Sequence, residues 1–255
     1  MDPALKVHVF LMCHNEEALL PATVRHYQQA LPDCPITIFD NMSTDDSVKL
    51  AVAAKCRIVP WDSPIEGQLH EPTMTRIKNC EWKQFVTPGT WIIMCDMDEW
   101  LNITLAQLQE EDSRGTTILQ TKAMQMVGES LSKDLSDLDI AKLDRGFPDP
   151  VYSKRICFKW DSVDPCYYDG CHDGKPIGTL IHSISEYTIK HMNALGAAYL
   201  ADKHARRYAR NKMNRELLGL SCHYIPERHR VYELHKEYVA RATTLPQPLA
   251  MRAWR

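Results

Sequence analysis

The sequence lacks any long apolar run. Nowhere among its 255 residues do about 18 consecutive apolar residues occur, which is the length that a membrane-spanning helix needs. The first six residues also lack the basic-then-apolar build of a secretory signal. We therefore expect a soluble protein with no transmembrane segment, located in the cytoplasm.

The cysteines lack the spacing of a disulfide framework or a zinc finger. There are nine of them, an odd number, and no two form a CxxC pair. Reduced thiols in a cytosolic compartment fit this pattern best, several of them buried as small hydrophobes. Cys166, Cys171 and His172 suggest zinc, but a fourth ligand at finger-like spacing is missing, so we do not favour it.

The net charge is only −3, but it is unevenly placed along the chain. Residues 201–255 hold 12 basic against 5 acidic residues, which leaves 18 against 28 in the rest. Such a tail is compatible with nucleic-acid binding. A solvated helical face, or a patch that meets phosphate or an anionic membrane surface, is the favoured interpretation. We predict no nucleic-acid partner and leave open peripheral membrane contact through the basic C-terminal helices.

Strand and helix patterns alternate over the first hundred residues. The run at 90–95 is continuously apolar, which is typical of a central parallel strand buried on both faces. Predicted strands cover 7–12, 36–39, 56–61, 90–95, 117–126, 152–159 and 179–184, and predicted helices include 73–85, 194–220 and 227–243. This order predicts an α/β fold with a mostly parallel central sheet flanked by helices.

Three polar segments follow predicted strands and are candidates for a ligand site. Ligands of open parallel sheets bind at the carboxyl ends of the strands, which selects 13–17, 40–43 and 96–99. Asp96 and Asp98 are two residues apart, so their carboxylates face the same way if the chain stays extended. Oxygen ligands of this kind suit Mg²⁺ or Mn²⁺, which can neutralise a departing nucleoside diphosphate. The chemistry predicted is glycosyl or phosphoryl transfer, and the alternative is a solvated acidic turn.

These three segments together resemble the family 2 glycosyltransferases of the GT-A fold, in a viral and bacterial branch. Phe10–Glu17, Phe39–Ser47 and Met94–Leu101 occur in the family's order, each at a strand end. The resemblance implies an inverting hexosyl or pentosyl transferase that uses Mn²⁺ or Mg²⁺. Its donor would be a nucleotide-diphosphate sugar, UDP-sugar favoured, and its acceptor a glycan or another hydroxyl. The location implied is cytoplasmic, in the host if the protein is viral.

The resemblance also implies roles for individual residues. Nucleotide-sugar contacts fall on Cys13, His14, Asn15, Glu16, Asp40, Asn41, Arg76, Asp96 and Met97, with Asp40 bonded to the base. The metal falls on Asp96 and Asp98, completed by His172 or His191. Glu99 orients the donor sugar or is only a carboxylate at a helix start.

The catalytic base and the phosphate partners are less defined. Inversion needs one carboxylate to take the acceptor proton, and the sequence does not choose among Glu129, Asp169 and Asp173. Lys154 and Arg155 are the favoured partners of the donor phosphates. The cluster Arg206, Arg207 and Arg210 lies on one stretch of helix and is interpreted as a solvated face.

We assign residues 1–255 to a single GT-A domain. Within it, 1–101 form the nucleotide-sugar-binding half, 102–193 the half that completes the acceptor and metal sites, and 194–255 a basic helical C-terminal extension. Two other functions stay open. One is a catalytically inactive GT-A-like module that binds a nucleotide-sugar or glycan. The other is a DxD phosphatase, which would carry the motif on its first strand rather than its fourth.

Overall fold

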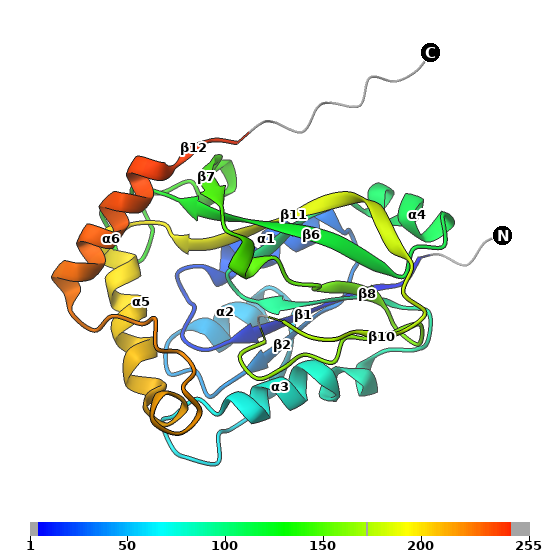
Figure 1. Ribbon diagram of the computed structural model, residues 1–255, viewed down its shortest axis with the longest axis horizontal. Helices are drawn as coiled ribbons and strands as arrows, with labels where there is room; N and C mark the ends of the chain where they lie inside the picture. Colours follow the sequence, from blue (N-terminus) through cyan, green and yellow to red (C-terminus); the bar gives the residue numbers. More distant parts are fainter. Residues whose placement is uncertain (1–4, 172, 246–255) are drawn as a thin grey trace.

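The computed structural model describes residues 5–171 and 173–245, built around one large mixed sheet (Figure 1). Four strands run parallel in the order β4 (Trp91–Asp96), β1 (Val7–Cys13), β2 (Ile36–Asp40), β3 (Arg57–Pro60). Because β1 and β4 lie inside the sheet, residues on both of their faces are buried, as their unbroken apolar sequence predicts.

The second half of the chain extends the sheet on the side of β4. The additional strands are β5 (Glu99–Asn102), β6 (Ile118–Val127), β7 (Arg145–Pro148), β8 (Cys157–Lys159), β11 (His182–Ala194) and β12 (Thr243–Thr244). Strand β8 pairs antiparallel with both β4 and β6, while β11 pairs parallel with β6 and antiparallel with β5. A separate pair is formed by β9 (Val163–Asp164) and β10 (Ile177–Gly178).

Helices cover the sheet and one of its ends. They are α1 (Leu20–Ala30), α2 (Ser47–Ala53), α3 (Glu71–Asn79), α4 (Leu105–Ser113), α5 (Ala197–Arg210) and α6 (Arg228–Arg241). Short turns are η1 (Glu81–Phe85), η2 (Ile140–Lys142), η3 (Pro150–Tyr152) and the π-helical η4 (Asn214–Leu218). Figure 1 shows α5 across the end of the sheet toward which β1 points. The prediction of an α/β fold with a mostly parallel sheet flanked by helices is confirmed.

Alternate residues of the central strands supply two hydrophobic cores. Leu11 and Ile93 belong to the core that includes α1, whereas Phe10 and Met94 belong to the core that includes Trp82 of η1. Burying each such side chain contributes about 1.5–3 kcal/mol. Layers on both faces therefore hold β1 and β4 in place and fix where their carboxyl ends lie.

Some element boundaries differ from the sequence-based prediction. The run predicted as a strand over 152–159 enters the sheet only at Cys157, because before that point Lys154 turns inward and side-chain bonds replace the ladder. The helix predicted over 73–85 breaks at Cys80 into α3 and η1. Strand β11 begins at His182 and continues to Ala194, far past the predicted end at residue 184.

Helix α5 begins directly after Gly196, and a side chain there would collide with the Ser130 carbonyl oxygen. This close approach ties the start of α5 to the loop that follows β6. Among the described helices, none is both long enough and apolar enough to cross a lipid bilayer.

Candidate functional site

A cavity of about 490 Å³ lies at the carboxyl ends of the parallel strands. The loops after β1, β2 and β4 line it on one side, and α5 with the loop that follows it lines the other. Its volume falls within the range of about 300–1,000 Å³ typical of small-molecule sites. The three strand-end segments singled out in the sequence therefore meet at one cavity.

The acidic motif lies on the floor of this cavity. Asp96 ends β4, Asp98 lies in the turn that follows, and Glu99 begins β5. Asp98 and Glu99 are 2% and 1% exposed. The backbone N–H of Asp96 donates to Glu99 Oε2 at 3.1 Å, and the Asp98 carbonyl oxygen accepts from Met192 of β11 at 2.7 Å. His191 is thereby brought beside the motif, with its Nε2 3.5 Å from Asp98 Oδ2.

Three buried lysines form ion pairs with the motif. Lys78 Nζ of α3 lies 2.6 Å from Asp96 Oδ1, and Lys203 Nζ of α5 lies 2.5 Å from Asp98 Oδ2. Lys154 Nζ lies 2.5 Å from Glu99 Oε1 and 3.5 Å from Asp96 Oδ2. None of the three lysines is more than 4% exposed. Each carboxylate of the motif thus has an ammonium partner inside the protein.

These ion pairs control the ionisation of the motif. Burial by itself would raise the pKa of the Asp96 carboxyl, but Lys78 and Lys154 outweigh it and hold that pKa below its usual range. Burial likewise opposes ionisation of Asp98, yet Lys203 and His191 keep its pKa well below the ordinary value. Asp96 and Asp98 are therefore anionic at neutral pH.

The same pairs argue against the predicted Mn²⁺ or Mg²⁺ at Asp96 and Asp98. At an effective dielectric constant of about 20, two unit charges about 4 Å apart repel by about 4 kcal/mol, and a divalent ion doubles this. A metal bound to either aspartate would lie next to a buried ammonium group. In residues 5–171 and 173–245, no three His, Cys, Asp or Glu side chains are placed to hold a metal ion. His172 lies outside the described residues. The residues present do not fit the metal in the predicted arrangement.

The loop after β1 presents a neutral imidazole to the cavity. His14 Nδ1 lies 2.6 Å from the carbonyl oxygen of Asn41, and because that oxygen can only accept, Nδ1 carries the proton. Burial, with Arg210 nearby, lowers the pKa of His14 to about 4. At neutral pH its Nε2 is consequently an acceptor. Cys13 and Glu16 line the same cavity.

Asp40 and Asn41 at the end of β2 were both expected to contact the nucleotide-sugar, but they have different surroundings. Asp40 is 4% exposed, and its two carboxylate oxygens accept from the backbone N–H and the hydroxyl of Ser43. Asn41, the next residue, lines the cavity instead and accepts a bond from Arg210. The assignment of Asp40 to the nucleotide base stays a prediction, and Asn41 is the residue of the pair that lines the cavity.

Several predicted site residues lie away from the cavity. Arg76 is on the exposed side of α3 and pairs with Glu81, whereas Lys78, two residues on, faces the motif. Glu129 pairs with Arg145 at the surface. Among the described residues that line the cavity, Arg76 and the base candidates Glu129, Asp169 and Asp173 are absent.

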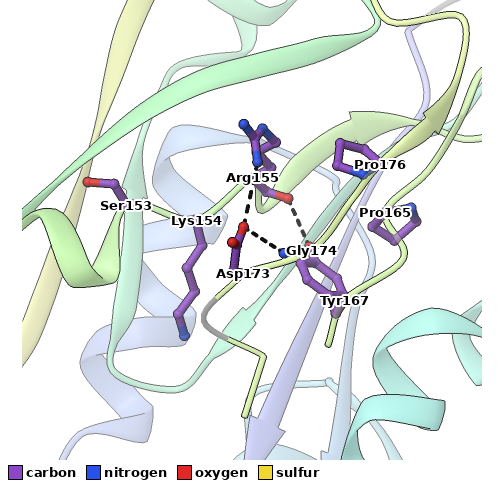
Figure 2. A pocket seen from close by; sticks show the side chains of 8 residues that line it. All are labelled: Ser153, Lys154, Arg155, Pro165, Tyr167, Asp173, Gly174 and Pro176. Carbon is purple, nitrogen blue, oxygen red and sulfur yellow. Dashed lines mark hydrogen bonds and ion pairs between the residues drawn. The ribbon is translucent and has the colours of Figure 1, made fainter. Parts of the chain in front are cut away.

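The neighbours Lys154 and Arg155 point to opposite sides of the chain. Figure 2 shows Arg155 turned toward Asp173, with its Nη1 3.8 Å from Asp173 Oδ1, while Lys154 extends away from both. Asp173 is 76% exposed in this pair. Of the two cations favoured for phosphate contacts, only Lys154 lies at the acidic motif.

The arginines of α5, interpreted from sequence as a solvated face, line the cavity. Arg206 Nη1 donates to the Asn15 carbonyl oxygen at 2.7 Å, and Arg207 Nη2 lies 3.4 Å from Glu16 Oε1 and 3.6 Å from Asp98 Oδ2. Arg210 closes the row at the end of the helix. Positions 203, 206, 207 and 210 recur at helical spacing, so the sequence contained a signal for one shared face.

Two carboxyl groups not singled out in the sequence also line the cavity. Glu71 begins α3, is 4% exposed, and its Oε2 has no hydrogen-bond partner among the described residues. Burial raises the pKa of its carboxyl. Asp149, directly after β7, lines the cavity from the second half of the chain.

No protein-family model and no curated protein matches the sequence. Among solved structures, TarS of S. aureus in complex with UDP aligns with 15% identity over 50% of this chain and 38% of that chain, with a TM-score of 0.37. Glucosyl-3-phosphoglycerate synthase of Mycobacterium tuberculosis with Mn²⁺ and UDP aligns with 19% identity over 47% and 44%, with a TM-score of 0.33. The mannosyltransferase PcManGT of Pyrobaculum calidifontis, with GDP-Man and Mn²⁺, aligns with 16% identity over 47% and 36%, with a TM-score of 0.33.

The chain thus matches glycosyltransferase structures at low identity over about half of its length. It spans less than half of each of these three structures. At these TM-scores the likeness establishes no activity, donor or metal for this chain.

Proposed function

We propose that the chain is a glycosyltransferase that binds a nucleotide-diphosphate sugar in the strand-end cavity and transfers the sugar to a hydroxyl of a glycan or similar acceptor. One observation carries the proposal: the acidic motif and the arginine row of α5 face the same cavity. Carboxylates accept hydrogen bonds from sugar hydroxyls, and guanidinium groups bind phosphates. A nucleotide-sugar contains both of these partners.

The nucleoside end of the donor would lie against the loops after β1, β2 and β3. His14 offers an acceptor nitrogen there, and Asn41 lies beside it. Trp61 follows β3, bonds the Asp40 carbonyl oxygen through its backbone N–H at 2.9 Å, and lines the same cavity. Its indole N–H is buried and has no partner among the described residues. UDP remains the favoured nucleotide.

The catalytic base is proposed to be Asp149. Inverting transfer is a single displacement in which the acceptor oxygen attacks the anomeric carbon while a carboxylate takes its proton. Asp149 lines the cavity from the half of the chain that the sequence assigns to the acceptor, whereas Glu129 and Asp173 are paired with surface arginines. Since the carboxylates expected to hold Mn²⁺ or Mg²⁺ are already ion-paired, no step of this reaction is assigned to a metal.

The alternatives are an inactive module that binds a nucleotide-sugar or glycan, and a phosphatase. The phosphatase is disfavoured because the acidic motif follows β4, the fourth strand in chain order, rather than the first. A panel of UDP- and GDP-sugars, tested for nucleoside diphosphate release and for transfer to glycan acceptors, separates these functions. Binding without turnover would favour the inactive module, and a chain that binds no nucleotide-sugar would contradict the proposal.

A further inference from the structure

We propose that this site binds the donor diphosphate without a metal ion, with buried lysines neutralising the acidic motif and the arginines of α5 supplying the positive charge. The inference rests on the proposed function and deepens it, since it names what compensates the leaving group. The observation behind it is the convergence of Lys78, Lys154 and Lys203 on three carboxylates.

The first step is the charge of the motif. Asp96, Asp98 and Glu99 carry three negative charges, and the three lysines carry three positive charges within 2.6 Å of them. Lysines are almost never fully buried unless they are paired. These come from α3, from the segment before β8 and from α5, so three separate parts of the fold each place one ammonium group here. A motif that recruits a metal needs negative charge left over, and this one has none.

The second step is the charge on the opposite wall. Arg206 and Arg210 both line the cavity. Arg206 donates to the Asn15 carbonyl oxygen and pairs with Asp202 at 2.9 Å, whereas Arg210 donates to a neutral acceptor, the Asn41 side-chain oxygen. Within the described part of the chain, no carboxylate lies at ion-pair distance from Arg210. Burial, together with Arg207 and Arg206, lowers the pKa of Arg210 to about 10, so it stays charged at neutral pH. The α5 wall therefore favours an anion.

The third step is the chemistry. In transfer, the bond from the anomeric carbon to the diphosphate oxygen breaks, and the bond from the acceptor oxygen to that carbon forms. The acceptor proton goes to the carboxylate base, and the nucleoside diphosphate leaves with one additional negative charge. Charge-assisted hydrogen bonds from guanidinium groups stabilise such an oxygen where it develops charge. The arginines would contact the diphosphate directly, while the lysines act through the motif.

The decisive measurement is UDP and GDP binding to the wild-type chain by calorimetry, in excess EDTA and in saturating Mn²⁺. We expect a Kd for the preferred nucleotide that agrees within about threefold between the two conditions. Binding that requires Mn²⁺ and disappears in EDTA would overturn the metal-free site and leave the glycosyltransferase proposal standing. Absence of nucleotide binding in both conditions would overturn the glycosyltransferase proposal itself, and the metal-free site with it.

Two substitutions test the arginines of α5 and the buried lysines separately. Arg210→Gln removes a charge that has no carboxylate partner in the described chain, and we expect the Kd to rise about tenfold in EDTA. Arg230→Gln, on the exposed face of α6, is the matched control and should leave the Kd unchanged. An unchanged Kd in Arg210→Gln would contradict the role of the α5 wall.

Lys203→Gln tests whether the buried lysines neutralise the acidic motif. The readout is a response to Mn²⁺ that a purely structural lysine would not give. Removing the Lys203 ammonium takes away the nearest cation of Asp98 and leaves Arg207 3.6 Å away. Mn²⁺ should therefore raise the melting temperature of the variant while leaving that of the wild type unchanged. Lys236→Gln, an exposed lysine of α6, is the control. If Lys203→Gln does not fold, Lys78→Gln poses the same question at Asp96. A folded variant that ignores Mn²⁺ would count against the inference.

Discussion

Lys203 Nζ lies 2.5 Å from Asp98 Oδ2, and each side chain of this pair is 2% exposed. The two residues are 105 positions apart, and their contact joins α5 to the turn between β4 and β5. The pair thus links the basic C-terminal part of the chain to the floor of the cavity.

Breaking that pair should cost much of the stability of the fold. Lys203→Ala leaves a carboxylate buried without its nearest cation, and we expect a loss of about 3–5 kcal/mol in the free energy of unfolding. Urea denaturation of the variant and the wild type measures this. Lys236→Ala, which removes an exposed ion pair with Glu233, should stay within about 0.5 kcal/mol of the wild type. Equal losses in the two variants would contradict the structural role of Lys203.

Acid should destabilise the protein through the same motif. The pKa values of Asp96 and Asp98 are lower in the folded chain than in the unfolded one, so below about pH 4 the unfolded chain binds more protons. The stabilisation is therefore present above the unfolded pKa and is lost as pH falls toward the folded values. Denaturant titrations from about pH 6 to about pH 3, a range that includes the unfolded pKa, should show that the free energy of unfolding decreases. In the double variant Asp98→Asn with Lys203→Gln, the free energy of unfolding should decrease less steeply with falling pH. The same pH dependence in the variant and the wild type would contradict the role of Asp98 in acid destabilisation.

Glu71 should have the opposite pH dependence. Burial raises the pKa of its carboxyl, Lys78 opposes this and Asp96 adds to it, so the folded chain holds the proton to higher pH than the unfolded one. Its stabilising contribution is present below the unfolded pKa and is lost as pH rises through the folded value. We expect Glu71→Gln to be more stable than the wild type at pH values above the folded pKa, by about 1.4 kcal/mol per unit of the shift. Melting curves of both proteins across pH test this, and a variant less stable at every pH would disprove it.

Asp149→Asn should separate catalysis from donor binding. If Asp149 takes the acceptor proton, kcat should fall by about 10²–10⁴-fold while nucleotide affinity stays unchanged. Asp173→Asn is the matched control, because Asp173 is exposed and pairs with Arg155 (Figure 2). A loss of activity in Asp173→Asn, with an active Asp149→Asn, would return the base to one of the positions predicted from the sequence.

The sequence predicted the sheet and the floor of the cavity because both depend on local pattern. Continuous apolar runs identify β1 and β4 as buried on both faces, and the rule for strand ends then predicts that Asp96 and Asp98 lie at the edge of the sheet where the cavity is found. The resemblance implied His191 as a metal ligand, and this role stays a prediction. Its Nε2 lies 3.5 Å from Asp98 Oδ2, on a strand that was predicted to end much earlier.

The side of the cavity that α5 forms could not be predicted in the same way. Helical spacing shows that Lys203 and Arg207 share a face, but it does not show whether that face meets solvent or the rest of the protein. That depends on how α5 packs, which is a tertiary property. The same limit explains Arg76 and Lys78, since the choice between two basic residues of α3 requires the rotation of the helix against the sheet.

The ion pair between α5 and the motif also orders events during synthesis. The ribosome makes Asp98 about a hundred residues before Lys203, and makes Asn15 about 190 residues before Arg206 bonds its carbonyl oxygen. Chains grow from the N-terminus, and contacts between residues so far apart in sequence form late. A nascent chain that stops before α5 holds an acidic cluster without its full set of counter-charges. The chain must therefore extend through α5 before the acidic centre has all of its counter-charges.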